Sequence, residues 1–281
     1  MRAQRAAGYD FIKIHGDLSD SAYHAVMSAA REAGIPVVGH APRRQGLGAA
    51  IAEHQPIAHL EEFLYAYFGH QKEITAENYM ALVRDASSQT AKAALPVMTT
   101  LTVFCGISRQ VQNLDSVLAR PEVARVPRGI VAEWRAGANP YTHERFPNTD
   151  ATDNQCILLK MLARQMQADG VLLVAGTDTP VPSTVPGFSL HDELRLLVEA
   201  GLTPYQALRT ATVNAATFLG VPGTFGQVTE GSRADLILSS EDPRRNIETL
   251  RHPVGLMIRG RWLNTAALDA LMPVVTRSRS R

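Results

Sequence analysis

Four residues whose side chains suit metal-assisted hydrolysis each close a short apolar run of this chain. Lys13 lies in Phe-Ile-Lys-Ile-His-Gly, His40 follows Val-Val-Gly, His59 follows Ile-Ala, and Asp178 follows Val-Ala-Gly-Thr. Such runs predict buried strands, and a helical pattern follows each one. Because the carboxyl ends of parallel strands converge on one face of a barrel, we expect the four side chains to meet there. Together they would suit a metal site that activates water.

Lys13 and His15 stand at the end of the first apolar run. A lysine buried among Phe11, Ile12 and Ile14 loses hydration unless it is neutralised or paired. The alternative is an ammonium group that reaches water from the strand end. A period of two places His15 on the same face as Lys13, which makes His15 a candidate for substrate contact.

His40 and His59 end two neighbouring runs. Neutral imidazole is a good zinc ligand, and Gly39 would let the backbone approach closely. The alternative for each is a core histidine held by a carbonyl group. Two histidines at adjacent strand ends favour the metal site.

Asp178 lies in a Gly-Thr-Asp-Thr-Pro segment. A carboxylate just beyond an apolar strand is well placed to hold a metal-bound water and to accept its proton. Thr177 and Thr179 could orient that carboxylate. The alternative is a helix cap or an Asx-turn.

Two other pairs of polar residues have a functional and a structural interpretation. His191 and Asp192 open a predicted helix and could face a substrate or cap the helix. Glu61 and Glu62 follow His59 and could bind a cationic substrate group. A helix N-terminus also favours acidic residues, and we prefer that interpretation of the glutamates.

The bulk composition is that of an ordinary globular protein. The 281 residues are 45% hydrophobic and 20% charged, with a formal net charge of +1, so no strong field would attract nucleic acid or an anionic membrane. The longest apolar stretches are strand-sized, which predicts no membrane-spanning helix. The compartment is left open, with a cytoplasmic location as the default expectation. Cys105 and Cys156 lack a Cys-X-X-Cys spacing and are weak support for a disulfide framework.

Strand-like runs alternate with helical patterns as far as about residue 220, which predicts a parallel sheet covered by helices. The predicted strands cover Phe11–Ile14, Ile35–Gly39, Pro56–His59, Leu95–Val103 and Val171–Ala175. The predicted helices cover Ser19–Ala33, Gly46–His54, Glu61–Phe68, Ala76–Ala94, Leu114–Arg135, Asp153–Ala168, His191–Ala200 and Pro204–Leu219. The intervening segments Phe104–Asn113 and Asn139–Thr152 are predicted to be loops that determine selectivity.

Beyond residue 220 the predicted elements are short strands separated by turns. They cover Gly226–Val228, Ala234–Leu238, Val254–Ile258 and Trp262–Leu263. We expect residues 1–220 to form an incomplete (β/α)8 TIM-like barrel and residues 221–281 a small β-sandwich portion and tail. At most five βα units precede the sandwich portion, whereas a closed barrel needs eight.

Several motifs resemble the metal-dependent amidohydrolase superfamily, in particular its imidazolonepropionase-like and prolidase-like branch. The matching segments are Phe11–Gly16, Pro36–Ala41, Ile57–Glu61, Gly176–Pro180, Gly187–Leu194, Leu202–Ala216 and Gly231–Leu238. The resemblance implies a distorted (β/α)8 barrel with a β-sandwich built from both chain ends. It implies that Lys13 matches the bridging, carboxylated lysine of the fourth strand and that His40 and His59 match the ligands of the fifth and sixth strands. Asp178 would match the aspartate of the eighth strand, which binds metal and acts as the general base.

The first strand of that family supplies a His-X-His pair, and this sequence contains none. The expectation is therefore a family member that lacks the N-terminal part of the barrel. We expect a zinc-dependent hydrolase of carbon–nitrogen bonds in small amides or dipeptide-like substrates, with one or two divalent cations. The alternatives are an esterase or lactonase on the same scaffold, and a catalytically impaired fragment that associates with another chain, including as a homo-oligomer.

Overall fold

The computed structural model describes residues 1–16, 18–135 and 139–271. The chain divides into two compact units, and each is described by itself. The first unit comprises residues 1–99 and 161–174, and the second comprises residues 100–160 and 175–281.

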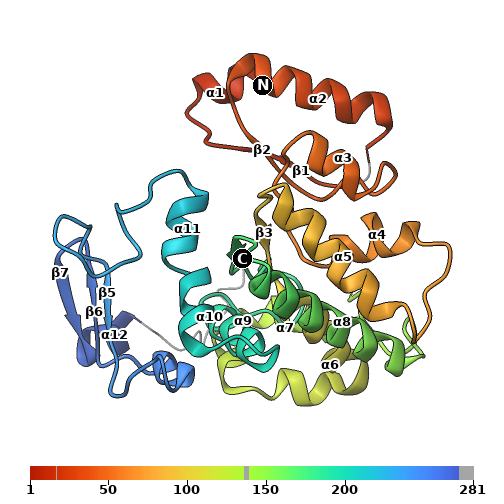
Figure 1. Cartoon of the computed structure of the whole chain (residues 1–281). Coiled ribbons are helices and arrows are strands. Elements are labelled where there is room, and N and C mark those ends of the chain that lie inside the picture. Colours follow the sequence, from red (N-terminus) through yellow and green to blue (C-terminus); the bar gives the residue numbers. More distant parts are fainter. Residues whose placement is uncertain (17, 136–138, 272–281) are drawn as a thin grey trace. The chain divides into compact units, whose positions relative to one another are not determined.

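A row of parallel strands organises the first unit (Figure 1). Its strands are β1 (Ile12–Ile14), β2 (Val37–Gly39), β3 (Val97–Met98) and β4 (Leu173–Val174). β1 pairs with β2, and β3 pairs with β4, both in parallel. Ile57 joins the two pairs because it bridges Gly39 on one side and Val97 on the other. Five parallel strand positions therefore follow one another in chain order, as the βα alternation predicts.

Helices connect these strands. They are α1 (Arg2–Ala6), α2 (Asp20–Ala33), α3 (Leu47–Ala52), α4 (Glu62–Ala66), η1 (Phe68–His70) and α5 (Tyr79–Lys92). The amphipathic helix α2 begins at a Ser19 side chain that accepts a bond from a backbone N–H, and it ends at Gly34 in the left-handed conformation. Its apolar face buries Tyr23 and Met27 against Val37 of β2. Burial of this face is what holds α2 on the strands.

The second unit is mainly helical (Figure 1). Its helices before residue 252, apart from α8, are α6 (Leu101–Leu118), η2 (Pro121–Arg125), α7 (Arg128–Arg135), α9 (Phe188–Glu199), α10 (Pro204–Thr210), α11 (Val213–Phe218) and η3 (Ile247–Arg251). Helix α8 (Thr149–Ala168) contributes residues 149–160 to this unit and its remainder to the first. A disulfide between Cys105 of α6 and Cys156 of α8 joins the two helices, with a Cα–Cα distance of 5.0 Å. The cysteine spacing offered only weak support for a disulfide, and this bond corrects that interpretation.

A three-stranded antiparallel sheet follows in the second unit. It contains β5 (Leu236–Leu238), β6 (Gly255–Ile258) and β7 (Arg261–Asn264), in that order, and α12 (Thr265–Leu271) comes after it. Arg259 and Gly260 connect β6 to β7 with φ angles of 49° and 81°, the two positive values that a type I′ hairpin requires. The strand predicted at Gly226–Val228 is wrong, because the backbone bends there and pairs with no strand among the described residues.

Several predicted boundaries are wrong for a common reason: tertiary contacts override local propensity. The segment predicted to continue a strand through Val103 and to form a loop over Phe104–Asn113 lies within α6. The carboxylate of buried Glu193 accepts hydrogen bonds from the backbone N–H groups of Leu101 and Thr102, at 3.0 and 2.8 Å, and so holds the start of this helix.

Two predicted long helices are interrupted. The helix predicted over Leu114–Arg135 is divided into α6, η2 and α7, because Pro121 and Pro127 cannot continue a helix. The helix predicted over Pro204–Leu219 breaks at Thr212, whose φ and ψ angles are −127° and −99°.

In the part of the chain that the structure describes, no helix combines the length and apolarity of a membrane span.

Candidate functional site

Four side chains from the first unit lie together where its parallel strands end. Nζ of Lys13 lies 3.4 Å from Nε2 of His59. The ring of His40 lies 5.1 Å from the ring of His59 and 4.6 Å from the ring of His15, measured between centroids. We call Lys13, His15, His40 and His59 the strand-end cluster. Residues separated by up to 46 positions thus meet at one edge of the sheet, as their places at strand ends predict.

The backbone of His40 is fixed by a buried chain of hydrogen bonds. Nε2 of Gln55 donates to the carbonyl oxygen of His40 at 2.8 Å, and Oε1 of Gln55 accepts from the hydroxyl group of Tyr23 at 2.9 Å. Gln55 is fully buried, so these bonds satisfy polar atoms that would otherwise be costly. Gly39 has a φ of 131°, and a Cβ there would lie 2.2 Å from the carbonyl oxygen of Ile14. Only glycine permits this close approach of β2 to β1.

Glu62 also lies beside His40, which the sequence interpretation missed. The glutamate is in the first turn of α4, as the preferred interpretation states, but it is fully buried and its Oε1 lies 3.2 Å from Nδ1 of His40. Arg43 donates to both carboxylate oxygens of Glu62, at 2.9 and 2.5 Å. The guanidinium of Arg43 also stacks 4.1 Å from the ring centroid of Tyr65. The signal in the sequence was Arg43, three residues after His40, but its pairing with Glu62 is apparent only once the fold is known.

The surroundings of His40 keep its imidazole neutral. Burial lowers the pKa of His40 to about 4, although the nearby Glu62 carboxylate acts in the opposite direction. At neutral pH the imidazole therefore has a lone pair available, which is the form that binds metal ions. Nδ1 of His40 is buried without an aligned hydrogen bond among the described residues, so Oε1 of Glu62 approaches it to 3.2 Å without forming one.

Lys13 is exposed, so the expectation of a buried lysine is wrong. The physical reason is the position of β1, which pairs only with β2 within the described residues and leaves its other edge uncovered. The ammonium group therefore reaches water, as the alternative interpretation states, while Nζ still approaches His59. His15 is exposed as well, whereas His59 is buried.

Asp178 belongs to the second unit, where it lies in an exposed turn. Its carbonyl oxygen accepts a hydrogen bond from the backbone N–H of Val181 at 3.3 Å, and its φ is 48°. The hydroxyl groups of Thr177 and Thr179 lie 3.0 Å apart on either side of it and bond to each other. Asp178 thus has the turn backbone that aspartate tolerates better than most residues.

His191 and Asp192 do not cap a helix, because α9 begins three residues before His191. Burial lowers the pKa of His191, and the positive charge of Arg251 acts in the same direction. Asp192 is buried and pairs with Arg120 at 3.3 Å and with Arg251. Asp192 therefore stabilises the packing of the second unit. Its neighbour His191 has a buried Nδ1 without a hydrogen-bond partner among the residues described.

The strand-end cluster contains side-chain types that are known as zinc ligands. His40 and His59 would supply imidazole nitrogens, and Lys13 would supply an oxygen donor only after carboxylation. Within residues 1–16, 18–135 and 139–271, no group of three or more His, Cys, Asp or Glu side chains is arranged to hold a metal ion. A donor set completed by the modified lysine is consistent with that finding, since lysine is not among those four residue types.

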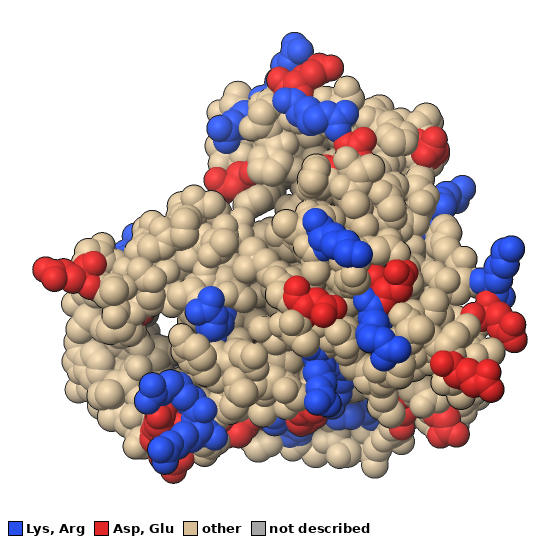
Figure 2. All heavy atoms as spheres, in the orientation of Figure 1, with Lys and Arg blue, Asp and Glu red and all other residues tan. Residues whose placement is uncertain are grey.

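Charge on the molecular surface is mixed. On the face shown in Figure 2, basic and acidic side chains are interspersed, and neither sign forms a continuous patch. This distribution agrees with the net charge of +1, and on that face it offers no continuous basic track for a polyanion.

Comparisons with known proteins identify the family. Imidazolonepropionase of Chloroflexus aggregans is 25% identical over a match that covers 62% of this chain and 47% of that protein. The solved structure of a bottromycin amidohydrolase has a TM-score of 0.72 and 25% identity, covering 96% of this chain and 59% of the other. A Xaa-Pro dipeptidase with bound methionine has a TM-score of 0.62 and 18% identity, covering 94% and 56%.

The chain thus spans about half the length of these relatives. The imidazolonepropionase match supports the predicted branch, and the structural matches show an α/β fold of the TIM-barrel superfamily. The model of the amidohydrolase family matches residues 11–263, and the chain accordingly belongs to the amidohydrolase family.

Proposed function

We propose that this chain carries part of the active site of a metal-dependent hydrolase that cleaves amide or related carbon–nitrogen bonds. The observation that carries the proposal is the strand-end cluster, in which Lys13 Nζ lies 3.4 Å from His59 Nε2 and the His40 and His59 rings lie 5.1 Å apart. Membership of the amidohydrolase family supports the reaction class. The bottromycin amidohydrolase and the Xaa-Pro dipeptidase suggest small amides or dipeptide-like substrates.

His40, His59 and carboxylated Lys13 would hold a divalent cation, most simply zinc. When bound, the cation would supply Lewis-acid polarisation of the substrate carbonyl and a water of pKa about 7. Glu62 would orient the His40 ring through Nδ1, and Arg43 would hold the Glu62 carboxylate in place through its two hydrogen bonds. His40 is already neutral at working pH, so no proton must leave it when a ligand bond forms.

Asp178 would be a metal ligand and the general base. In this proposal its carboxylate accepts the proton of the attacking water and delivers it to the leaving nitrogen. Thr177 and Thr179 flank it and would restrict its orientation. His15 and His191 are proposed to contact the substrate, His15 from its position beside His40.

We also propose that residues 1–220 correspond to strands four to eight of a (β/α)8 barrel and that residues 221–281 contribute a β-sandwich portion. The five parallel strand positions of the first unit and the antiparallel β5–β6–β7 sheet support this assignment. The missing His-X-His ligands would then come from another part of the polypeptide or from an associated chain, such as a second copy.

Zinc content tests the metal site independently of activity. We expect the wild type to bind zinc, and the double variant His40→Ala/His59→Ala to lose at least about nine-tenths of it. His54→Asn is the matched control, because His54 is exposed in a turn after α3 and should leave the zinc content unchanged. Equal zinc in the double variant and the wild type would refute the ligand assignment.

Turnover tests the base. Asp178→Asn should lower the hydrolysis rate of an amide panel by at least about 100-fold while zinc stays bound. Near-wild-type rates in Asp178→Asn would remove this aspartate from the mechanism. Rates on matched esters, measured beside the amides, identify the preferred bond.

A further inference from the structure

A second candidate site lies within the second unit, and its lining residues have no role in the hydrolytic site proposed above. A cavity of about 200 Å³ opens beside helix α6 and is lined by residues of that helix together with Arg120 and Ser183. We call it the Arg109 pocket, because Arg109 is the lining residue whose charge lacks a partner.

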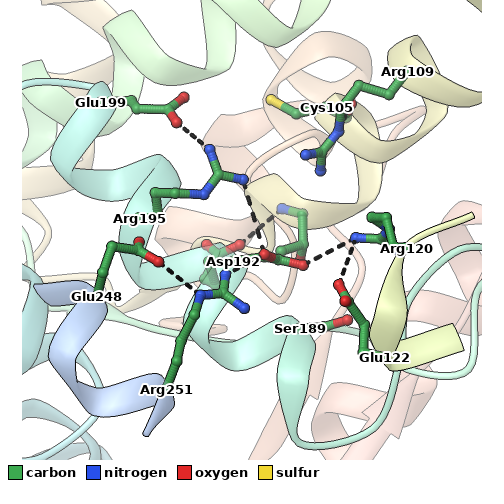
Figure 3. Close-up of polar contacts among 12 residues, drawn as sticks. Cys105, Arg109, Arg120, Glu122, Ser189, Asp192, Arg195, Glu199, Glu248 and Arg251 are labelled. Atoms are coloured by element: carbon green, nitrogen blue, oxygen red, sulfur yellow. Dashed lines mark hydrogen bonds and ion pairs between the residues drawn. The ribbon is translucent and has the colours of Figure 1, made fainter. Parts of the chain in front are cut away.

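Arg109 is a partly buried cation without a carboxylate partner among the described residues. Its Nε donates to the carbonyl oxygen of Cys105 at 3.2 Å, and the described residues place no acidic side chain within ion-pair distance of it. Burial lowers the pKa of Arg109, and the positive charge of Arg195 lowers it further, while the carboxylates of Asp192 and Glu199 act in the opposite direction without forming an ion pair with it. Figure 3 shows the guanidinium beside a network of ion pairs, with no dashed line joining it to the carboxylates drawn. A charge that is partly withdrawn from water and has no ion-pair partner is costly, so we expect a counter-ion from outside the protein to bind here.

The neighbouring acids are already engaged by other cations. Asp192 pairs with Arg120 at 3.3 Å and with Arg251 (Figure 3). Glu199 pairs with Lys160 at 2.6 Å and with Arg195. Each of these carboxylates has at least two cationic partners, and neither is left to neutralise Arg109.

The carboxylate next to the lining residue Gln112 is engaged by neutral donors rather than by cations. Asp153 accepts hydrogen bonds from Nε2 of Gln112, at 2.7 Å to each oxygen, and from the hydroxyl group of Ser108. These bonds occupy the oxygens of Asp153, so Asp153 forms no ion pair with Arg109.

The remaining walls of the pocket offer hydrogen-bond donors. Helix α6 breaks at Asn113, whose φ and ψ are −159° and 88°, and the break brings Asn113 and Ser116 to the pocket wall. Ser183 is held at a φ of 75°, a strained value for a residue with a side chain. Gly106 faces it, and a Cβ at Gly106 would come within 3.3 Å of the Ser183 hydroxyl oxygen. The absence of that Cβ leaves the hydroxyl group room to turn toward a ligand.

We propose that the Arg109 pocket binds a small oxyanion, a phosphate or carboxylate group, through the Arg109 guanidinium. Planar guanidinium nitrogens match two oxygens of either group, and hydroxyl and amide donors at Ser116, Ser183 and Asn113 suit the remaining oxygens. The bound oxyanion would supply the negative charge that no carboxylate of the described residues places beside Arg109.

The test is calorimetric titration of the full chain with inorganic phosphate and, separately, with acetate. We expect Arg109→Gln to weaken binding by about tenfold or more, the usual effect of losing a charge-assisted bidentate contact. Arg244→Gln is the control, since Arg244 is an exposed arginine that pairs with Asp242, and this variant should bind like the wild type. The arm with the tighter binding identifies the preferred group.

A second pair of variants tests the pocket without altering Arg109. Ser116 is exposed at the pocket wall, so Ser116→Glu and Ser116→Gln differ in charge but hardly in size. We expect Ser116→Glu to weaken oxyanion binding by about tenfold relative to Ser116→Gln, because a like charge repels the ligand. Wild type that binds neither probe, or equal affinities in wild type, Arg109→Gln and Ser116→Glu, would overturn the proposal.

Discussion

Removal of the Cys105–Cys156 disulfide should destabilise the second unit by about 4 kcal/mol. The bond joins cysteines 51 residues apart, and closing a loop of that length removes about 14 cal/mol/K of entropy from the unfolded chain, which is about 4 kcal/mol at room temperature. The loop contains most of α6, all of α7 and the start of α8. For a unit of this size the loss corresponds to a fall in Tm of roughly 10 °C.

The assay is thermal and urea unfolding of the wild type and of Cys105→Ala/Cys156→Ala, each with and without a phosphine reductant. Reductant should lower the unfolding free energy of the wild type by about 4 kcal/mol and should leave that of the double variant unchanged. This pairing separates the cross-link from the packing of the two side chains, since Cys105 is buried and its truncation also removes contacts.

The reasoning is refuted in either of two ways. Thiol titration of the unfolded, unreduced wild type would find two free thiols if the bond does not form. Alternatively, a reductant could leave the unfolding curve of a fully oxidised protein unchanged, and loop closure would then contribute nothing measurable to stability.

Three further predictions concern the polar and backbone features that hold the two units. Glu193→Ala should lower the free energy of unfolding in urea by about 2–5 kcal/mol, because two N–H groups at the start of α6 lose their acceptor. Glu193→Gln should lower it less. Equal losses in the two variants would contradict a role for the charge. Gly39→Ala should lower the free energy of unfolding by at least about 3 kcal/mol, because the new Cβ would meet backbone atoms of Ile14. Gly48→Ala in α3 places its Cβ in open space and should raise the free energy of unfolding by about 0.5–1 kcal/mol. Similar effects of the two changes would refute the close approach of β2 to β1. His191 has a lowered pKa in the folded protein, so below about pH 6.5 the unfolded chain takes up a proton that the folded chain resists, and the unfolding free energy should fall as pH falls. His191→Gln should reduce that slope between pH 6.5 and the lower folded pKa, and an unchanged slope would show that other groups cause it.

The strand-end residues were predictable because their signals are local. Apolar runs followed by helical patterns mark the parallel strands, and a polar residue at the end of such a run has only one edge of the sheet to occupy. The cap residues Ser19 and Gly34 likewise fix the limits of α2 from the sequence alone, as found. His40 and His59 meet for the same reason, although no spacing in the chain states the 5.1 Å between their rings.

The missed features depend on contacts between distant segments. Helix α6 has strand-like β-branched residues at its start, and it is helical because Glu193, more than 90 residues later, bonds its first N–H groups. The disulfide depends on α6 and α8 lying side by side, which a separation of 51 residues cannot indicate. Glu62 was assigned to a helix N-terminus, which is correct, but its bonds to Arg43 and its contact with His40 arise only once β2 and α4 are placed.

Backbone strain singles out two of the predicted site residues. His54 and Ala94 have φ angles of 49°, and each stands two residues past a helix end, where the left-handed conformation completes the cap. His59 and Asp178, with φ angles of 79° and 48°, have no helix end to explain them. Each follows a predicted strand instead, and such conformations cost about 1–3 kcal/mol for a residue with a side chain. Glycine would relieve that cost at both positions, so an imidazole and a carboxylate there are in keeping with the roles proposed above for His59 and Asp178.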